Sequence, residues 1–384
     1  MMDASPARLL PKLLVIGAGP AGTSAAIRLR DQGHEVLLVE RAEFPRDKIC
    51  GCCLNLAAIA SLSRIGCDAI ITELATAPLS RWELRLGEQR IGASLPGGVA
   101  VSRRAMDSTL VNEAVRRGVT LRLRCEAKVT AVTDDRVTVS LRSDKQASEL
   151  LEFDAVILAS GLSGGGVSQW LPFTRFPAGP IGVGLVLDSM DQVVSQTIHM
   201  ICGKNGYVGL VRLEDGRVDL AAAIRRPSKN ESPFGRNEIA ARISALLRTF
   251  GRQELTPQNI ADLKMTPPLT RSRKVGFGAL LVAGDAAGYV EPFTGEGMAW
   301  AIEGGIEAAD CVSQHFSVTT QNPPVLAEQW ERAYAKISRK RQWICRFVSM
   351  ALGSERVAGY LIPAMNLAPW VVKLAVRRLN RISG

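Results

Sequence analysis

The feature that most constrains this chain is a glycine-rich turn at residues 17–22, GAGPAG, placed between an apolar run and a helical pattern. The run at 12–16 predicts a buried strand, and the helical pattern of 23–32 stops at Gly33. A second buried strand is predicted at 35–39. Strand, helix and strand within about thirty residues form a βαβ unit, which favours a parallel sheet.

The turn fits the pattern G-x-G-x-x-G, and Glu40, at the end of the second strand, is the acidic residue that dinucleotide-binding turns require. In this pattern Gly17 permits a tight turn, Gly19 lets the backbone approach a pyrophosphate, and Gly22 lets helix and sheet pack closely. The helix N-terminus offers N–H groups and a positive dipole to the phosphates. The residues expected to contact the pyrophosphate are Gly17, Gly19, Pro20, Ala21 and Gly22. The alternative is a glycine turn without a ligand, and the turn alone does not distinguish NAD from FAD.

A second glycine cluster, residues 284–297 (GDAAGYVEPFTGEG), also follows a buried strand and opens a helix. A second helix N-terminus at the ligand suits a flavin ring, whose N1/O2 edge gains negative charge on reduction. Before this cluster, residues 181–224 change to short alternating strands, with an Asp-Gly turn at 215–216 that indicates a hairpin. The pattern predicts an α/β domain into which an antiparallel sheet is inserted.

Three segments together carry a family resemblance: the first glycine turn with Glu40, residues 44–51 (FPRDKICG), and the second glycine cluster. They resemble the FAD enzymes of the para-hydroxybenzoate hydroxylase superfamily, and most of all its geranylgeranyl reductase-like subgroup, over residues 11–310. The resemblance implies an FAD-dependent oxidoreductase with a Rossmann-like FAD-binding domain. It also implies that NADH or NADPH serves as a transient hydride donor.

The resemblance assigns further FAD contacts by position. Glu40 binds the adenosine ribose with Arg41 beside it, and Asp285 bonds to the ribityl chain. Arg103 matches the arginine of an R-x-x-[FLM]-D motif, and Arg104 is the alternative if the register shifts by one. The remaining residues expected at FAD are Gly161 and Gly284 and, at the isoalloxazine ring, Pro292, Gly295 and Gly297.

Two departures from the family pattern concern the substrate side. Where the family often carries an Asp-Gly pair linked to flavin and nicotinamide contacts, this chain has Ser160 followed by Gly161. Where geranylgeranyl reductases carry Y-x-W-x-F-P, residues 207–212 read YVGLVR, so Tyr207 remains and the Trp, Phe and Pro do not. A rebuilt substrate pocket is therefore expected. The W-x-W-x-I-P signature of flavin halogenases is absent from the sequence, which disfavours halogenation.

Cys50 and Tyr207 are the two candidate catalytic residues. Cys50 and Gly51 resemble the Cys-Gly pair that reductase relatives place near the flavin. There, Cys50 either donates a proton or packs as a small buried hydrophobe. Cys52 and Cys53 lack the second spaced pair of ligands that a zinc site needs, so no metal is predicted. With three histidines in the chain, a Ser-His-Asp hydrolase is disfavoured as well.

The changes along the chain between an α/β pattern and short alternating strands set the predicted domain boundaries. The predicted FAD-binding domain is discontinuous and comprises residues 1–65, 96–170 and 272–315. The predicted substrate-binding sheet domain comprises residues 66–95 and 171–271. A helical C-terminal region, 316–384, ends in a basic amphipathic tail.

The net charge of +10 is concentrated at the C-terminal end, where residues 336–384 hold ten basic side chains and one acidic one. The rest of the chain is nearly neutral. No nucleic-acid partner is expected, because a general nucleic-acid surface would spread basic residues over one face of the body. From Pro369 onward the apolar and basic residues segregate as in an amphipathic helix. This helix either makes a peripheral contact with an anionic membrane or docks on the protein's own body.

No secretory signal is visible, and no apolar run reaches the length of about 18 residues that a spanning helix needs. A cytoplasmic protein is therefore expected, peripheral at the inner face of a membrane if the tail binds there. The expected activity is that of an FAD-dependent oxidoreductase acting on a hydrophobic small molecule. The motifs favour C=C reduction in a prenyl or polyketide-like lipid. A monooxygenase that hydroxylates an aromatic or polyketide substrate, and a flavin-binding electron carrier without its own substrate, are the alternatives.

Overall fold

The computed structural model describes residues 10–74, 76–144, 147–164, 166–226, 234–251, 254–290, 295–318 and 325–338. Two of the expectations above fall outside these ranges, namely the role of Pro292 and the basic amphipathic tail from Pro369 onward. Both stay predictions.

A six-stranded sheet forms the first layer of the molecule. Its strands, in spatial order, are β18 (Gly276–Phe277), β19 (Leu280–Val282), β12 (Ala155–Leu158), β1 (Leu13–Ile16), β2 (Val36–Val39) and β8 (Thr120–Arg122). All neighbours are parallel except the edge strand β18, which is antiparallel to β19. Every residue of β1 and β12 is buried, as expected for parallel strands that are covered on both faces. The predicted α/β fold with a parallel Rossmann-like sheet is confirmed.

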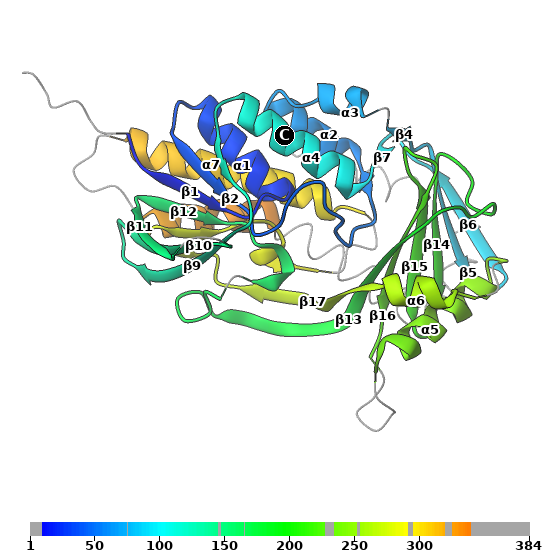
Figure 1. Cartoon of the computed structure of the whole chain (residues 1–384). Helices are drawn as coiled ribbons and strands as arrows, with labels where there is room; N and C mark the ends of the chain where they lie inside the picture. Colours follow the sequence, from blue (N-terminus) through cyan, green and yellow to red (C-terminus); the bar gives the residue numbers. More distant parts are fainter. Residues whose placement is uncertain are drawn as a thin grey trace, which may run out of the picture.

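Helices gather on one side of this sheet, and a small antiparallel sheet lies on the other (Figure 1). The helices are α1 (Pro20–Asp31), α2 (Leu56–Arg64), α3 (Ala69–Glu73), α4 (Arg103–Arg116) and α7 (Gly297–Ser317). The small sheet, in spatial order, is made of β11 (Glu149–Phe153), β10 (Val137–Ser143) and β9 (Cys125–Val132). Helices α1 and α7 pack so closely that a Cβ on Gly305 would lie 2.0 Å from the carbonyl oxygen of Ala21.

An eight-stranded sheet forms the other part of the molecule. Its strands, in spatial order, are β20 (Gly288–Tyr289), β17 (Lys264–Arg273), β13 (Phe173–Leu187), β16 (Val218–Ile224), β15 (Gly206–Arg212), β14 (Thr197–Gly203), β5 (Arg81–Leu86) and β6 (Gln89–Ser94). All neighbours are antiparallel except β14 and β5. The long strands β13 and β17 belong to this second sheet and extend beneath the first one (Figure 1). The predicted antiparallel sheet beside the FAD-binding fold is thus present.

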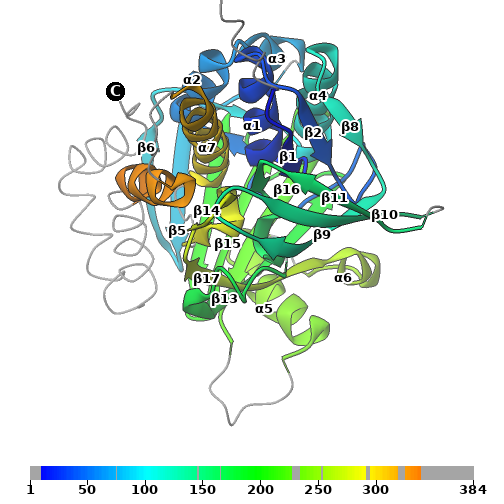
Figure 2. The same cartoon turned by 90° about the vertical axis from the view of Figure 1, so that its left-hand side faces the viewer.

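The two faces of the second sheet have different neighbours. Helices α5 (Arg236–Arg248) and α6 (Pro257–Asp262) lie along one face (Figure 2). Val208 and Leu210 of β15 pack in a core with α5, and so do Val218 and its apolar partners on β16. Because side chains alternate along a strand, Val211 of β15 and Asp219 of β16 point to the opposite face.

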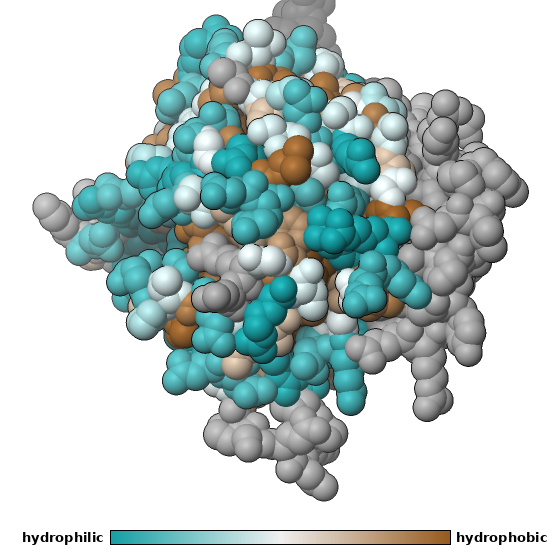
Figure 3. All heavy atoms as spheres, turned by 90° about the vertical axis from the view of Figure 1, so that its right-hand side faces the viewer, coloured by the Kyte–Doolittle hydropathy of each residue, from teal (hydrophilic) through white to brown (hydrophobic). Residues whose placement is uncertain are grey.

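Short elements connect the two large sheets. A three-stranded sheet has the order β3 (Cys53–Leu54), β7 (Val99–Ala100) and β4 (Ala77–Pro78). Two 3-10 turns, η1 (Gly161–Ser163) and η2 (Gly284–Ala286), follow β12 and β19, and residues 326–338 are helical. Hydrophilic side chains cover most of the face on the β5–β6 side, and hydrophobic ones show in small groups (Figure 3). Within the described ranges, no helix is long and apolar enough to cross a membrane. The exact domain boundaries stay a prediction.

Candidate active site

The first glycine turn links β1 to α1 at the carboxyl end of the parallel strand. Gly17 has a φ of +101°, in the left-handed region that glycine adopts without strain. A Cβ on Gly22 would lie 1.8 Å from the carbonyl oxygen of Gly17, so a larger residue cannot fit without movement of the backbone. Gly19 is the N-cap of α1 and makes no side-chain cap, and Pro20 follows it. The helix N-terminus therefore keeps backbone donors that an anion can use.

Glu40 follows β2 and is buried beside this turn. Its Oε2 accepts a hydrogen bond from the backbone N–H of Ala18 at 3.0 Å, and its Oε1 accepts one from Ala42 at 3.0 Å. The two bonds hold the carboxylate in one orientation. An ionised carboxylate has about four acceptor sites, so Glu40 keeps capacity for ribose hydroxyl groups. Arg41, beside it, is exposed.

Two arginines lie over the glycine turn. Arg103 donates to both oxygens of the buried Asp107 at 2.8 Å each, and Nη1 of Arg46 lies 3.3 Å from the same carboxylate. A Cβ on Gly19 would lie 3.8 Å from Nη2 of Arg103 and 4.0 Å from Nη2 of Arg46. Nε of Arg46 is buried and has no hydrogen-bond partner among the described residues, and the buried Nη1 makes the ion-pair contact with Asp107 but no hydrogen bond within those residues. Such donors beside a helix N-terminus fit a pyrophosphate, because charge-assisted bonds to phosphate are strong.

Of the two arginines left open by the sequence, Arg103 faces the turn and Arg104 does not. The side chain of Arg104 is 48% exposed and lies 3.8 Å from Asp47, whereas that of Arg103 is 13% exposed. Arg46 stands within the segment FPRDKICG, but no sequence pattern gave it a role. Its place over the turn depends on the path of the chain after β2, which carries no periodic signal.

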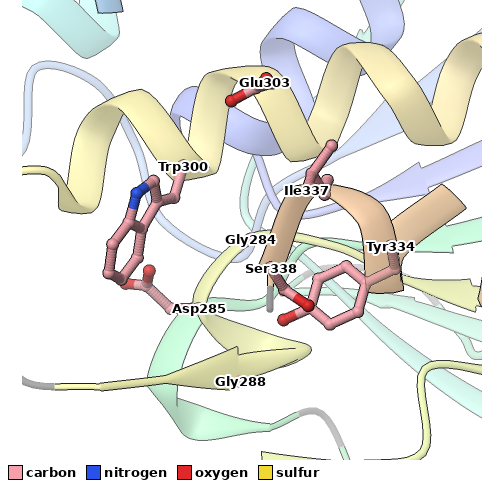
Figure 4. Close-up of a pocket in the computed structure, with 8 residues that line it drawn as sticks. All are labelled: Gly284, Asp285, Gly288, Trp300, Glu303, Tyr334, Ile337 and Ser338. Atoms are coloured by element: carbon pink, nitrogen blue, oxygen red, sulfur yellow. The ribbon is translucent and has the colours of Figure 1, made fainter. Parts of the chain in front are cut away.

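The second glycine cluster meets the first across α1. A Cβ on Gly284 would lie 2.8 Å from the Cβ of Ala21. Asp285 and Trp300 line a small cavity between η2, α7 and the helix at 326–338, and the Asp285 carboxyl lies beside the Trp300 ring (Figure 4). Burial raises the pKa of Asp285 to about 6, against the opposing charge of Arg103. Nε1 of Trp300 is buried without a hydrogen-bond partner in the described part of the chain. The cavity therefore offers polar groups that a ribityl chain can use.

The cysteine segment, residues 49–53, lies between the second glycine cluster and the eight-stranded sheet, which is called the large sheet below. A Cβ on Gly295, just before α7, would lie 3.9 Å from the Cβ of Cys53. On the other side, a Cβ on Gly184 of β13 would lie 3.1 Å from the side chain of Ile49. The Cys53 thiol donates to the carbonyl oxygen of Gly51 at 3.0 Å. The segment 49–53 thus joins the N-terminus of α7, which begins at the predicted Gly297, to the sheet predicted to bind substrate.

Cys50 and Cys52 form a thiol pair with unequal proton affinity. A hydrogen bond from the Cys52 thiol lowers the pKa of Cys50 to about 6; burial opposes this shift, and the positive charge of Arg103 supports it. The same contact raises the pKa of Cys52 well above its usual value, and so does burial. Cys52 has a φ of +51°, a conformation that side-chain-bearing residues rarely adopt and that concentrates at functional sites. Cys50 is therefore the acidic thiol of the pair.

Alkylation of Cys50 by iodoacetamide is expected to rise with pH around a midpoint of about 6 instead of 9.0, because the thiolate is the reacting form. Cys52→Ala removes a hydrogen bond to the thiolate and is expected to raise this midpoint by about one pH unit or more. Mass spectrometry of the peptide that contains Cys50 measures both midpoints. Cys53→Ala, which removes the neighbouring thiol, should leave the midpoint in place. A midpoint near 9.0 in the unchanged protein would contradict the assignment.

Tyr207, the second candidate catalytic residue, lies further from the cysteine segment. Tyr207 packs with Leu84 and Met200, whereas Val211, on the same face of β15, packs with Cys52. At about 3.3 Å per residue, Tyr207 and Val211 are separated by about 13 Å along the strand. The structure does not place Tyr207 in the Cys52 cluster, and its catalytic role stays a prediction.

Gly161 begins η1, directly after the parallel sheet, and has a φ of +65°. Oγ of the preceding Ser160, which replaces the family's acid, is buried and has no partner among the described residues. Turns η1 and η2 are in contact, so Gly161 lies beside the turn that carries Asp285.

A helix N-terminus, two arginines and a held carboxylate around one glycine turn match what a dinucleotide requires, and the second glycine cluster adjoins this turn at Ala21. Fold and site therefore define a flavoprotein of the dinucleotide-binding class. The chain belongs to the FAD binding domain family, whose model matches residues 11–314. It is an FAD-dependent oxidoreductase.

Curated relatives and a solved structure agree with this family. The menaquinone reductase of Mycobacterium tuberculosis (strain ATCC 25618 / H37Rv) is 24% identical over 339 residues, which cover 85% of this chain and 82% of the relative. The digeranylgeranylglycerophospholipid reductase 2 of Methanopyrus kandleri is 24% identical over 352 residues, 84% of this chain and 83% of the relative. The structure of Klebsiella pneumoniae HpxO complexed with FAD and uric acid superposes with a TM-score of 0.74 at 16% identity, covering 96% of both chains. This last likeness concerns the fold.

Proposed function

We propose that this protein is a reductase that uses hydride from NADH or NADPH to saturate a C=C bond of a prenyl or polyketide-like lipid, with Cys50 as the proton donor. The observation that carries the proposal is the position of Cys50. Its thiol lies in the segment between the second glycine cluster and the large sheet, where the positive charge of Arg103 helps to lower the pKa of Cys50. A thiol whose proton is easily released at this position suits general acid chemistry near neutral pH.

The residues that would hold FAD are the glycine turn and Glu40, with Arg46 and Arg103 at the pyrophosphate and Asp285 at the ribityl chain. When bound and reduced by NADH or NADPH, FAD would supply the hydride that adds to one carbon of the double bond. Cys50 holds the proton at Sγ and gives it to the other carbon, so the S–H bond breaks as the C–H bond forms. The large sheet closes the site on the substrate side and limits access of water.

The two curated relatives support the substrate class. Both names denote reductases of prenyl lipids, a menaquinone and a digeranylgeranyl phospholipid. The apolar face of the large sheet suits such a substrate, because Val211 and Val186 of this face lie in one apolar cluster with Cys50 and Cys52. At about a quarter sequence identity, these relatives support reduction of a prenyl lipid as a class and do not single out one compound.

Anaerobic turnover in deuterated water tests the proposal. The FAD-loaded protein, NADH or NADPH, and either menaquinone or a digeranylgeranyl phospholipid are expected to give a product with one double bond fewer and one deuterium from solvent. Cys50→Ala should slow this reaction about 100-fold, the usual size of a general acid contribution, whereas Cys53→Ala should not. A product that carries one oxygen atom from O₂ in aerobic reactions, and no saturated product without O₂, would overturn the proposal in favour of a monooxygenase.

A further inference from the structure

Residues 43–51, here the crossing segment, pass from β2 to β3 across the site without regular secondary structure. No backbone N–H or C=O group of these residues makes a backbone–backbone hydrogen bond within the described part of the chain. The segment nevertheless carries Cys50, and it contacts the glycine turn through Arg46. Backbone without such bonds opens at a lower free energy than a strand or helix, so side chains must hold this segment in place.

The side chains that hold the crossing segment differ in strength. Phe44 packs against the core of the first sheet. Asp47 lies 3.4 Å from Lys264 and 3.8 Å from Arg104, but all three side chains are about half exposed, and exposed ion pairs contribute little. Of the charged residues in the segment, all of which lie in the described range 10–74, Arg46 is the one with a buried side chain, at 9% exposure. Arg46 is therefore the main polar anchor of the segment.

The protein holds Arg46 less completely than it holds Arg103. Nη2 of Arg46 donates to the carbonyl oxygen of Ala18 at 3.3 Å and to Glu40 at 3.4 Å, both longer than ordinary hydrogen bonds. Nη1 lies 3.3 Å from Asp107, and the buried Nε has no hydrogen-bond partner among the described residues. Arg103, in contrast, donates twice to Asp107 at 2.8 Å. Because unpaired buried donors cost free energy, Arg46 gains more than Arg103 from an added anion.

The place for that anion is the N-terminus of α1. Nη2 of Arg46 lies 4.0 Å from the position of a Cβ on Gly19, the N-cap residue of a helix whose first N–H groups suit a pyrophosphate. The phosphate oxygens can accept bonds from the helix and from the guanidinium together. Bonds that complete Arg46 also fix the backbone that carries it. The same segment reaches Cys50 four residues further along the chain.

We propose that Arg46 is a positioning residue that couples the pyrophosphate of bound FAD to the crossing segment, so that the cofactor fixes the place of Cys50. The inference rests on the proposed function, in which Cys50 gives its proton to the substrate carbon. The proton donor then takes its place only after the hydride carrier has bound. By linkage, the affinity for FAD and the order of the segment rise and fall together.

Hydrogen–deuterium exchange of the full chain, without cofactor, with FAD and with ADP, tests the coupling without any turnover. FAD is expected to slow exchange at the amides of residues 46–51 about tenfold or more. ADP, which carries the pyrophosphate group but no isoalloxazine ring, should slow it to the same degree at concentrations that protect residues 21–23 of α1. Exchange that FAD leaves unchanged would overturn the proposal, and so would protection that FAD gives and ADP does not.

Variants of Arg46 test its part in the coupling. In Arg46→Met with FAD at saturation, shown by protection of residues 21–23, residues 46–51 are expected to exchange at the rate of the cofactor-free protein. Arg46→Lys, which keeps the charge at a single point, should restore part of the protection. Lys264→Met is the matched control, because it removes a cation from the exposed side of the same segment, and it should keep native protection. Native protection of residues 46–51 in Arg46→Met would overturn the proposal.

The comparison of FAD with ADP uses the unchanged protein, so it decides the question even where a variant fails to bind the cofactor. Failure of the proposed function gives a different result from failure of the coupling. A monooxygenase would yield oxygenated product in the turnover assay while FAD and ADP still protect residues 46–51. Failure of the coupling would leave these residues unprotected by ADP while the saturated product still forms.

Discussion

Replacing Gly22 with alanine is expected to abolish FAD binding and to lower the free energy of unfolding by about 3 kcal/mol or more. The added Cβ would lie 1.8 Å from the carbonyl oxygen of Gly17 and 3.2 Å from the side chain of Ala159. The first of these atoms belongs to the backbone of the glycine turn and cannot rotate away. Helix α1 must therefore move, and its N-terminus leaves the phosphate site.

The flavin absorbance that remains with the protein after gel filtration, together with urea unfolding, measures both effects. Gly235→Ala is the matched control, because it makes the same chemical change at the N-cap of α5, where a Cβ would meet nothing within 4 Å. This control should retain FAD and change stability by about 0.5 kcal/mol or less. Full flavin content in Gly22→Ala would contradict the assigned role of the turn.

Replacing Arg103 with methionine is the second large effect expected. The change removes two hydrogen bonds of 2.8 Å from Asp107, whose side chain is 0% exposed and would keep only the 3.3 Å contact with Arg46. Removing one partner of a buried ion pair costs about 3 kcal/mol or more, because an uncompensated charge remains. The variant also loses a cation that faces Gly19, so FAD affinity should fall about 100-fold, as expected for a strong charge-assisted contact.

Arg104→Met provides the neighbouring comparison. Its side chain is 48% exposed and lies 3.8 Å from Asp47, so its loss should change the free energy of unfolding by about 0.5 kcal/mol or less. Titration of the apoprotein with FAD, followed by fluorescence quenching, measures both affinities. Equal losses of affinity in the two variants would contradict the register that assigns the contact to Arg103.

Local patterns were sufficient for the parts of the site that are built from neighbouring residues. The glycine turn and Glu40 could be assigned because the geometry of a strand, a turn and a helix follows from residues close in sequence. The choice between Arg103 and Arg104 could not, since adjacent helical positions point in directions about 100° apart and only the packing of α4 decides which faces the turn.

The sequence by itself determined the α/β class, the two glycine clusters and the inserted sheet, because turns and periodic burial are encoded over short windows. Only the tertiary structure decided that Arg46 shares Asp107 with Arg103 and that Asp219 lies on the face of the large sheet on which Val211 packs with Cys52. The one sequence sign of the position of Asp219 is that it is an isolated acid in the apolar strand VDLAAAI. The direction of this side chain depends on which face of β16 is turned to the site, and strand pairing between distant segments sets that face.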